Sequence, residues 1–230
     1  MITVALIGPD GAGKSTVARE LTHQALPAPV RPLYMGVNLE ASGLMLPTTR
    51  LALAAKRFRG RRADMVAPTA VSVATQPRRG AAADTVSGAV RLARLSLWVA
   101  EEWFRQLVAW YFRARGDIVV FDRHFFADYY HRDIAGEPGK RSVAGALHGL
   151  LLRKLYPKPD LVICLDAPGQ VLYERKGEAT AEWLERRRQQ YLQLATVVPH
   201  FAVVDACRPF DVVVKDVADT ITRFCETRFR

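Results

Sequence analysis

Hydrophobic residues in this chain fall into short continuous runs, separated by longer segments of mixed character. A short apolar run without polar alternation is typical of a strand that is buried on both faces, as in a parallel sheet. Such runs predict strands at Ile2–Ile7, Pro32–Met35, Ile118–Phe121, Leu161–Leu165 and Phe201–Val204.

The segments between these strands repeat hydrophobic residues at the spacing of an amphipathic helix. Strands that alternate with helices predict an α/β fold, in which a parallel sheet of about five strands is flanked by helices and carries its site at the carboxyl ends of the strands. The predicted helices are Thr16–Gln24, Val86–Arg115, Val143–Leu155, Pro168–Arg175, Ala179–Val197 and Asp211–Phe229.

One segment departs from this pattern. Arg59–Thr85 mixes arginines with Ala, Pro, Gly and Thr, so we predict a mobile insertion there. Residues 1–230 are otherwise expected to form a single domain, because a chain of this length that is half hydrophobic can bury one sizeable core.

The turn after the first strand carries the strongest chemical signal. It reads Gly8-Pro9-Asp10-Gly11-Ala12-Gly13-Lys14-Ser15, which fits G-x-x-x-x-G-K-[ST] between a strand and a helix. Glycines let backbone N–H groups turn toward phosphate oxygens, and the helix N-terminus adds its positive end. We expect an exposed Lys14 to reach the terminal phosphates and the Ser15 hydroxyl to ligate Mg²⁺. The motif predicts a nucleotide site of the P-loop NTPase type.

The third predicted strand ends in Asp122-Arg123. In nucleotide-binding α/β folds, a carboxylate at this place lies beside the phosphate loop and can hold Mg²⁺ directly or through water. The planar fork of Arg123 suits phosphate oxygens, so we expect it to face a substrate phosphate; a structural ion pair is the alternative. His124 follows directly and is expected to line the same site.

A mixed-charge stretch follows the fourth strand, at residues 174–190. Such a stretch is either a solvated helix face or, in a phosphotransferase, a lid whose arginines close on the transferring phosphoryl group. Because the loop contains no arginine, we expect the catalytic arginine to come from this lid. The candidates are Arg175, Arg186, Arg187 and Arg188.

The long predicted helix Val86–Arg115 carries large apolar side chains at helical spacing. Core or a subunit interface is the favoured interpretation, and a membrane-surface stripe is the alternative because basic residues lie nearby. An exposed tryptophan-rich stripe is costly in water, so we expect a homodimer. The side chains are Leu95, Trp98, Val99, Trp103, Leu107, Trp110 and Tyr111.

Composition narrows the class of partner. The chain has 33 Lys and Arg against 23 Asp and Glu, a formal charge of +10, which favours an anionic partner such as a nucleotide, nucleic acid or membrane surface. Its cysteines show no zinc or disulfide spacing, and Cys164 is expected in the core. No signal peptide precedes the first strand and no apolar run reaches about 18 residues, so we expect a cytoplasmic protein.

Several motifs, in order and across nearly the whole chain, resemble those of the thymidylate kinase family. They are the loop from Gly8 to Thr16 with its acidic Asp10, then Asp122-Arg123-His124, Pro159–Pro168 with the pattern P-D-L-x-x-x-L-D-x-P, Arg175, and Val204-Asp205-Ala206 with Pro209. The resemblance implies ATP- and Mg²⁺-dependent phosphoryl transfer from a nucleotide donor to a small-molecule acceptor, with a nucleoside monophosphate as the first choice.

The resemblance also implies roles for individual residues. Catalytic roles fall to Asp10, Lys14, Asp122, Arg123 and Arg175, and Mg²⁺ ligation falls to Ser15 and Asp122. The implied donor contacts are Gly8, Asp10, Gly11, Ala12, Gly13, Lys14, Ser15, Thr16, Arg186, Ala206 and Pro209.

The acceptor half of the chain departs from the family pattern. Leu33–Glu40 lacks the family's T-R-E-P-G segment, and Glu102 stands where a helix arginine usually meets the acceptor. A carboxylate there would repel a monophosphate, which predicts weak or absent activity on dTMP. Arg105, Arg123 or the basic Arg50–Arg62 segment would compensate if they fold over the site.

Two alternative functions stay open at this point. A relative that phosphorylates a hydroxyl of a nucleoside or sugar would use a general base, for which Asp10, Glu40, Glu102 and Asp122 are candidates. A nucleotide-dependent protein that binds nucleic acid or anionic lipid would instead use the basic segment. ATP turnover with and without small acceptors separates the enzyme from the binding protein.

Overall fold

The computed structural model describes residues 1–36, 44–58, 81–124, 126–127, 130, 149–151, 154–177 and 179–229, and for 52–53, 55–58 and 81–95 it describes the backbone alone. The chain divides into two compact units. The first comprises Met1–Met35, Ala109–Asp128 and Pro157–Arg230, and the second comprises Gly36–Val108 and Tyr129–Tyr156. The predicted insertion up to residue 80 and most of the predicted helix Val143–Leu155 lie outside the described residues.

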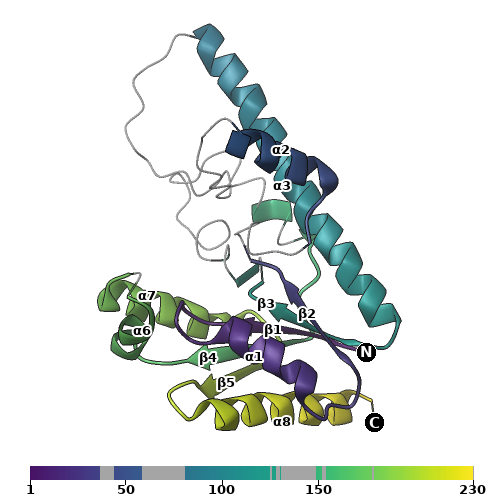
Figure 1. Ribbon diagram of the computed structural model, residues 1–230, viewed down its shortest axis with the longest axis vertical. Helices are drawn as coiled ribbons and strands as arrows, with labels where there is room; N and C mark the ends of the chain where they lie inside the picture. The colour runs from purple at the N-terminus through teal and green to yellow at the C-terminus, as the bar shows by residue number, and fades with distance from the viewer. Residues whose placement is uncertain are drawn as a thin grey trace. The chain divides into compact units, whose positions relative to one another are not determined.

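The first unit is built on a five-stranded parallel sheet with the order β2-β3-β1-β4-β5 (Figure 1). This arrangement confirms the predicted fold class. Because β1 lies between β3 and β4, successive strands spread to both sides of it, and the carboxyl end of β1 is the switch point where α/β sheets bind ligands. The strands are β1 (Thr3–Ile7), β2 (Val30–Tyr34), β3 (Ile118–Asp122), β4 (Leu161–Asp166) and β5 (Phe201–Asp205).

The helices of the first unit follow the predicted order. Two of them continue into a 3-10 turn, Leu21–His23 after α1 and Gln193–Thr196 after α7. The helices are α1 (Lys14–Glu20), α6 (Gly169–Lys176), α7 (Ala181–Leu192) and α8 (Phe210–Arg228).

The second unit contains α2 (Pro47–Phe58) and most of α3 (Ala81–Ala114). Helix α2 was not predicted, although a proline at a first helical position is a common start signal. Helix α3 begins ahead of the predicted Val86 because Ala81-Ala82-Ala83 are strong helix formers that extend it.

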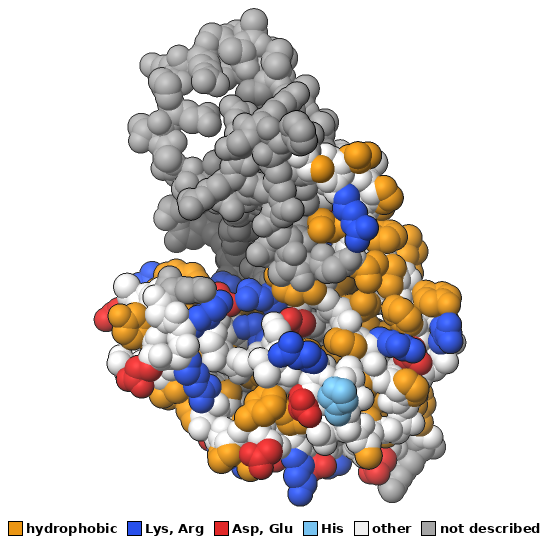
Figure 2. Space-filling view, in the orientation of Figure 1, with side chains coloured by type: hydrophobic (Ala, Val, Ile, Leu, Met, Phe, Trp, Pro, Cys, Tyr) orange, Lys and Arg blue, Asp and Glu red, His pale blue; other side chains and the backbone are white. Residues whose placement is uncertain are grey.

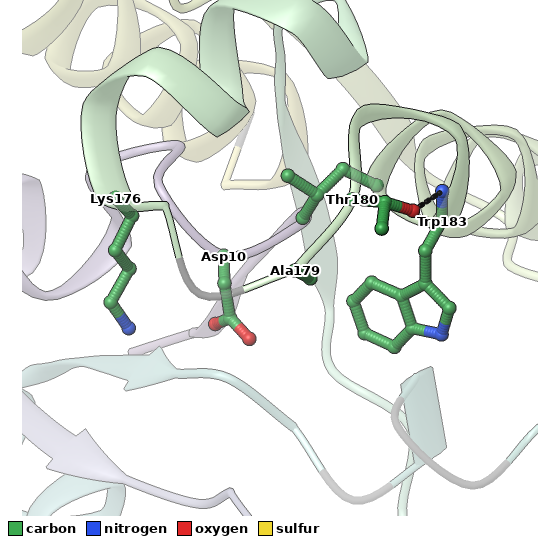
Figure 3. Close-up of a pocket in the computed structure, with 6 residues that line it drawn as sticks. Asp10, Lys176, Ala179, Thr180 and Trp183 are labelled. Carbon is green, nitrogen blue, oxygen red and sulfur yellow. Dashed lines mark hydrogen bonds between the residues drawn. The ribbon is translucent and has the colours of Figure 1, made fainter.

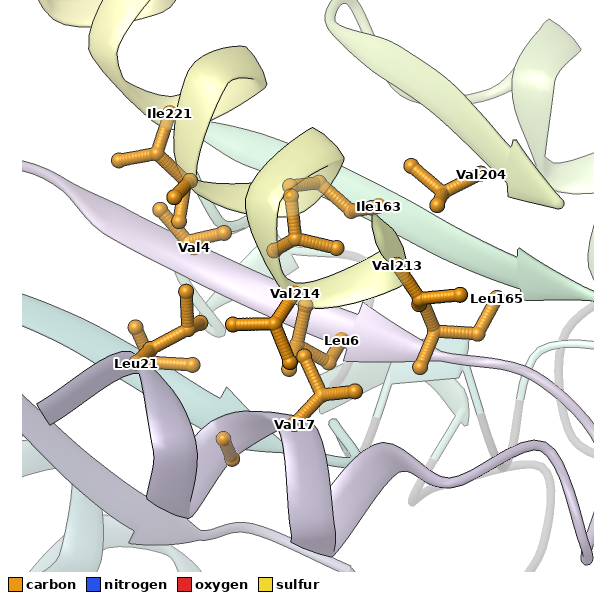
Figure 4. Packing of buried hydrophobic residues seen from close by; sticks show 14 of the residues in the cluster. Val4, Leu6, Val17, Leu21, Ile163, Leu165, Val204, Val213, Val214 and Ile221 are labelled. Atoms are coloured by element: carbon orange, nitrogen blue, oxygen red, sulfur yellow. The ribbon is translucent and has the colours of Figure 1, made fainter. Parts of the chain in front are cut away.

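The core of the first unit lies between the sheet and helices α1 and α8 (Figure 4). Val4 and Leu6 of β1 meet Val17 of α1 and Val214 of α8, and all four side chains are almost fully buried. Cys164 of β4 is buried as expected, and burial raises the pKa of its thiol to about 12. Among the described residues, none of the helices combines the length and apolar character needed to cross a membrane.

The aromatic stripe of α3 does not form one continuous face. Trp98 is buried, whereas Leu107, Trp110 and Tyr111 are exposed, the first and last by more than half. Figure 2 shows hydrophobic side chains gathered along this part of the molecule. The exposed group at the C-terminal end of α3 is therefore the part of the stripe that a second copy would cover.

We expect the protein to be a two-fold homodimer that Leu107→Asp converts to a monomer, because a charge in an apolar interface is desolvated without a partner. Sedimentation velocity at micromolar concentration measures both states. Leu51→Asp is the matched control, since Leu51 is 72% exposed on α2. A wild-type monomer at that concentration would rule out the dimer.

Candidate active site

The loop between β1 and α1 requires glycine at two of its positions, at Gly8 for its backbone angle and close packing and at Gly13 for its backbone angle alone. Gly8 has a φ of +140°, and a Cβ there would lie 2.5 Å from the Leu165 carbonyl oxygen at the end of β4. Gly13 adopts φ 88° immediately before α1. Side chains rarely tolerate such backbone angles, so the loop conformation depends on these glycines.

Lys14 is buried, with 5% of its surface exposed, so the expectation of an exposed lysine is wrong. Its Nζ donates to the carbonyl oxygens of Gly8 and Pro9, each at 2.7 Å. A buried ammonium needs such acceptors to offset its desolvation, and the loop's own backbone supplies them. The positive charge is thus held against the loop that the motif assigns to phosphate.

Asp10 joins the loop to the end of β3. Its Oδ1 accepts from the Arg123 guanidinium at 2.6 Å and lies 3.9 Å from Lys14 Nζ. Burial pushes the pKa of the Asp10 carboxyl up, but the charges of Arg123, Lys14 and Lys176 outweigh it and leave that pKa below its usual value. Arg123 has a left-handed φ of 67°, which is strained for a residue with a side chain. Arg123 therefore pairs with the loop.

Asp122 stands at the carboxyl end of β3, in register with Leu6 of β1. It is buried, and its Oδ1 has no hydrogen-bond partner among the described residues. A buried carboxylate oxygen without a partner is costly, which marks a place where a ligand or cation would be stabilised.

His124 follows two residues after Asp122 but is a core residue. It is 2% exposed, its ring packs 5.0 Å from that of Phe121, and its Nδ1 accepts from the backbone N–H of Phe126. Burial lowers the pKa of His124 to about 3, so the imidazole stays neutral.

The carboxyl end of β4 is tied to helix α7, which lies largely within the segment predicted to be a lid. Arg188 donates from Nε to Asp166 Oδ1 at 2.7 Å and from Nη2 to Oδ2 at 2.9 Å. Its Nη1 donates to Glu185 Oε1 at 2.9 Å, and Glu185 Oε2 accepts from the backbone N–H of Gly169. These hydrogen bonds, that to Asp166 above all, hold the pKa of Arg188 above its usual value.

The other candidate arginines of the lid differ in their surroundings. Arg187 is folded along α7, where it donates to Tyr191 Oη at 3.0 Å and lies over the Tyr191 ring. Arg175 and Arg186 are exposed. The structure thus separates the four candidates into two that are held by protein groups and two that face solvent.

A cavity of about 460 Å³ lies between the loop and the lid. Figure 3 shows Asp10 and Lys176 on one side of it and the indole of Trp183 on the other. The Thr180 hydroxyl, also in its lining, caps α7 by accepting from Trp183 N–H. The cavity therefore joins an anionic group, a cation and an aromatic face.

The turn after β5 lies beside the end of β4. Ala206 N–H donates to the Asp166 carbonyl at 2.7 Å, and Cys207 N–H donates to Asp205 Oδ1 at 2.8 Å. Burial and Asp205 raise the pKa of the Cys207 thiol while Arg175 acts against them, so Arg175 lies within electrostatic reach of this turn. Pro209 begins α8 just beyond it.

Glu102, which the sequence predicts to repel an acceptor phosphate, is held by protein side chains. The residue is fully buried in the second unit. Its Oε1 accepts from Trp98 Nε1 at 2.8 Å and its Oε2 from Tyr156 Oη at 2.6 Å. The carboxylate is a structural group that links α3 to Tyr156. Arg105, one turn along, is also buried and donates to the Gly36 carbonyl at 3.2 Å.

Sequence reasoning missed several residues of this site. Asp166 was quoted within a motif but given no role, and Glu185, Thr180 and Trp183 were not singled out. Asp166 carried a detectable signal, because it ends a buried strand just as Asp122 does.

Gly169→Ala is expected to loosen the lid. A Cβ at Gly169 would lie 2.4 Å from the Ala181 carbonyl oxygen and 2.8 Å from the Glu185 backbone nitrogen, so α6 and α7 would have to move apart. We expect the free energy of unfolding to fall by about 1–3 kcal/mol, as measured by thermal or urea unfolding. The exposed neighbour Gln170→Ala is the control, and a Gly169→Ala protein as stable as that control would contradict the packing described.

Together, the parallel sheet, the glycine loop with its buried lysine and the strand-end carboxylate define a nucleotide-binding α/β protein of the P-loop class. Comparison with curated relatives narrows this class to one family. It is 30% identical over 223 residues to thymidylate kinase of Xanthomonas euvesicatoria pv. vesicatoria (strain 85-10), covering 93% of this chain and 80% of the relative. It is 31% identical over 223 residues to that of Xanthomonas oryzae pv. oryzae (strain PXO99A), with the same coverage.

A third relative is thymidylate kinase of Xanthomonas campestris pv. campestris (strain B100). It is 28% identical to this chain over 238 aligned positions, which cover 100% of this chain and 86% of the relative. No family model matches the sequence. At these identities and coverages, the chain belongs to the thymidylate kinase family, whose members are phosphotransferases.

Proposed function

We propose that this protein transfers the γ-phosphoryl group of ATP, with Mg²⁺, to the phosphate of a nucleoside monophosphate, and that dTMP is accepted. The observation that carries the proposal is the glycine loop with Lys14 held at its carbonyls, next to the strand-end carboxylate of Asp122. Family membership supports it, because the curated relatives are named thymidylate kinase.

The donor nucleotide is assigned to the loop and the β5 turn. Backbone N–H groups of Gly8–Thr16 would bind the phosphates, and Lys14 would neutralise the charge that develops between them. The base would lie near Arg175 and the turn at Ala206 and Pro209, as the resemblance to the family implies. Arg186 is exposed on α7 and is the lid cation assigned to the phosphoryl group.

The residues present fit Mg²⁺. Asp122 offers a buried oxygen that has no partner in the described part of the chain, and the Ser15 hydroxyl is exposed at the start of α1. The part of the chain that the structure describes contains no cluster of three or more His, Cys, Asp or Glu that could hold a metal. In such enzymes Mg²⁺ takes one or two side chains together with substrate phosphates and water. The ion would neutralise phosphate charge during transfer.

The acceptor is assigned as a phosphate because the curated relatives are named thymidylate kinase and because two of the four candidate general bases, Asp10 and Glu102, are held by protein groups. Asp10 is committed to Arg123, and its pKa lies below the usual value, far from the neutral range that favours a base. Glu102 accepts hydrogen bonds at both oxygens. Glu40 lies outside the described residues. A monophosphate oxygen is already ionised, so its transfer needs positioning and charge neutralisation rather than a base.

Binding of dTMP is supported by the names of the curated relatives. The Glu102 carboxylate is held by Trp98 and Tyr156 within the second unit. Arg123, paired with Asp10 at the strand end, is the cation assigned to the acceptor phosphate. Lysine and arginine side chains are interspersed with acidic ones over the described face in Figure 2, which gives no separate support to a nucleic-acid surface.

An acceptor screen tests the proposal. ADP formation from Mg·ATP would be followed with dTMP, other nucleoside monophosphates, and thymidine as the matched acceptor without a phosphate. We expect dTMP to give a kcat/KM of about 10⁴ M⁻¹s⁻¹ or more and thymidine to stay at background. Turnover with thymidine alone would move the assignment to hydroxyl phosphorylation.

A further inference from the structure

We propose that Arg188 is a positioning residue: its fork ties the lid helix α7 to the end of β4, and this tether sets where the exposed lid arginine Arg186 stands relative to the phosphate loop. The inference rests on the proposed function for its kinetic consequence, whereas the tether itself can be tested without turnover. Arg188 is thereby distinguished from the lid groups that touch substrate.

The tether has the geometry of a two-point attachment. Arg188 donates hydrogen bonds to both oxygens of Asp166, at 2.7 and 2.9 Å. Its remaining nitrogen, Nη1, donates to Glu185 of its own helix. A planar guanidinium bridging two oxygens fixes orientation as well as distance, which an ammonium cannot do. Helix α7 is therefore held in one rotation about its axis, and the backbone position from which Arg186 extends is held with it.

Asp166 is a suitable anchor because its neighbours belong to the donor site. Its carbonyl oxygen accepts from Ala206 N–H in the β5 turn, and the carbonyl of the preceding Leu165 lies against Gly8 of the phosphate loop. Glu185, bonded to Arg188, also accepts from Gly169 N–H at the start of α6. A rotation of α7 would therefore be resisted at β4 and at α6, next to the loop and the turn.

The pair is partly buried, with a remaining route to water. The side chains of Arg188 and Asp166 retain 24% and 19% of their surface. A single partly exposed ion pair, even a bidentate one, contributes modestly to folding, so the protein is expected to fold without this one. The effect of losing it should fall on the placement of the lid, where a misplacement of about 1 Å costs on the order of a hundredfold in rate.

The experiment compares Arg188→Gln, Arg188→Lys, Asp166→Asn and the double variant Asp166→Asn/Arg188→Gln in the full chain. Steady-state kinetics with Mg·ATP and dTMP give kcat and KM, and hydrogen–deuterium exchange reports on the amides of Ala181–Leu192. Arg223→Gln is the control, because Arg223 is an exposed arginine of α8 that bonds within its own helix.

We expect Arg188→Gln to lower kcat by about a hundredfold with KM for ATP within about threefold of wild type. Arg188→Lys should lower kcat less than Arg188→Gln does, since the lysine keeps the positive charge but cannot bond both oxygens of Asp166. The double variant should be no slower than the worse single variant, because both break one contact. Exchange should rise across α7 in Arg188→Gln and stay unchanged in the control.

A kcat within twofold of wild type in Arg188→Gln would overturn the proposal, even if exchange rises. The proposal would also be overturned if the loss of kcat in the double variant equalled the product of the losses in the two single variants. Arg188 would then act on substrate independently of Asp166. If wild type transfers no phosphoryl group, the proposed function fails by itself. The tether is then judged by exchange alone, and unchanged exchange in Arg188→Gln rejects it.

Discussion

Lys14→Met is expected to abolish phosphoryl transfer while the fold persists. The substitution keeps an unbranched side chain of similar length but removes the ammonium that Gly8 and Pro9 hold at the loop. By analogy with other cations that neutralise the transferring group, we expect the rate to fall by about three powers of ten or more.

The effect of Lys14→Met on stability should be small, because the loss of two hydrogen bonds is offset by removal of a buried charge. Initial rates with saturating Mg·ATP and circular dichroism measure the two quantities. Lys215→Met, at an exposed lysine of α8, is the control for loss of one charge. A Lys14→Met protein that turns over at the rate of this control would refute the assignment of the loop.

Asp122→Asn is expected to lower activity without lowering the stability of the fold. Replacing the carboxylate that is assigned to Mg²⁺ should lower kcat by about a hundredfold or more and raise the Mg²⁺ concentration needed for half-maximal rate. Because Asp122 Oδ1 is buried without a partner in the described chain, removal of its charge should leave the melting temperature unchanged or raise it.

Asp117→Asn, just before the same strand, is expected to lower stability without lowering activity. Asp117 is buried and accepts from Arg31 Nε at 3.0 Å, so its loss should cost stability, by about 1 kcal/mol, and leave kcat unchanged. Titrations of rate against Mg²⁺ and thermal unfolding of both variants test the pair. An Asp122→Asn enzyme with wild-type Mg²⁺ dependence would remove Asp122 from the metal site.

The sheet and the loop were predictable because their signals are local. Continuous apolar runs located all five strands, and the spacing of glycines, lysine and serine located the loop. Strand β2 begins at Val30, ahead of the predicted Pro32, because it lies at the edge of the sheet. Edge strands tolerate exposed Arg31 and a proline, which obscure the apolar pattern.

The roles of the charged residues were less predictable because their partners are distant in sequence. Nothing local distinguishes Arg188 from Arg186; the difference is made by Asp166, at the end of another strand. Glu102 has one near partner, Trp98, at helical spacing, but its second, Tyr156, comes from the other end of the second unit's sequence. Lys14 is buried by backbone carbonyls, which carry no sequence signal at all.

The central claim is that a phosphate, and not a hydroxyl, accepts the phosphoryl group. The most direct measurement is ³¹P NMR of the protein with Mg·ATP and dTMP, with a parallel sample in which thymidine replaces dTMP. The account predicts the paired resonances of dTDP and ADP in the first sample and unchanged ATP in the second. Unchanged dTMP beside intact ATP, or conversion of thymidine to dTMP, would contradict it.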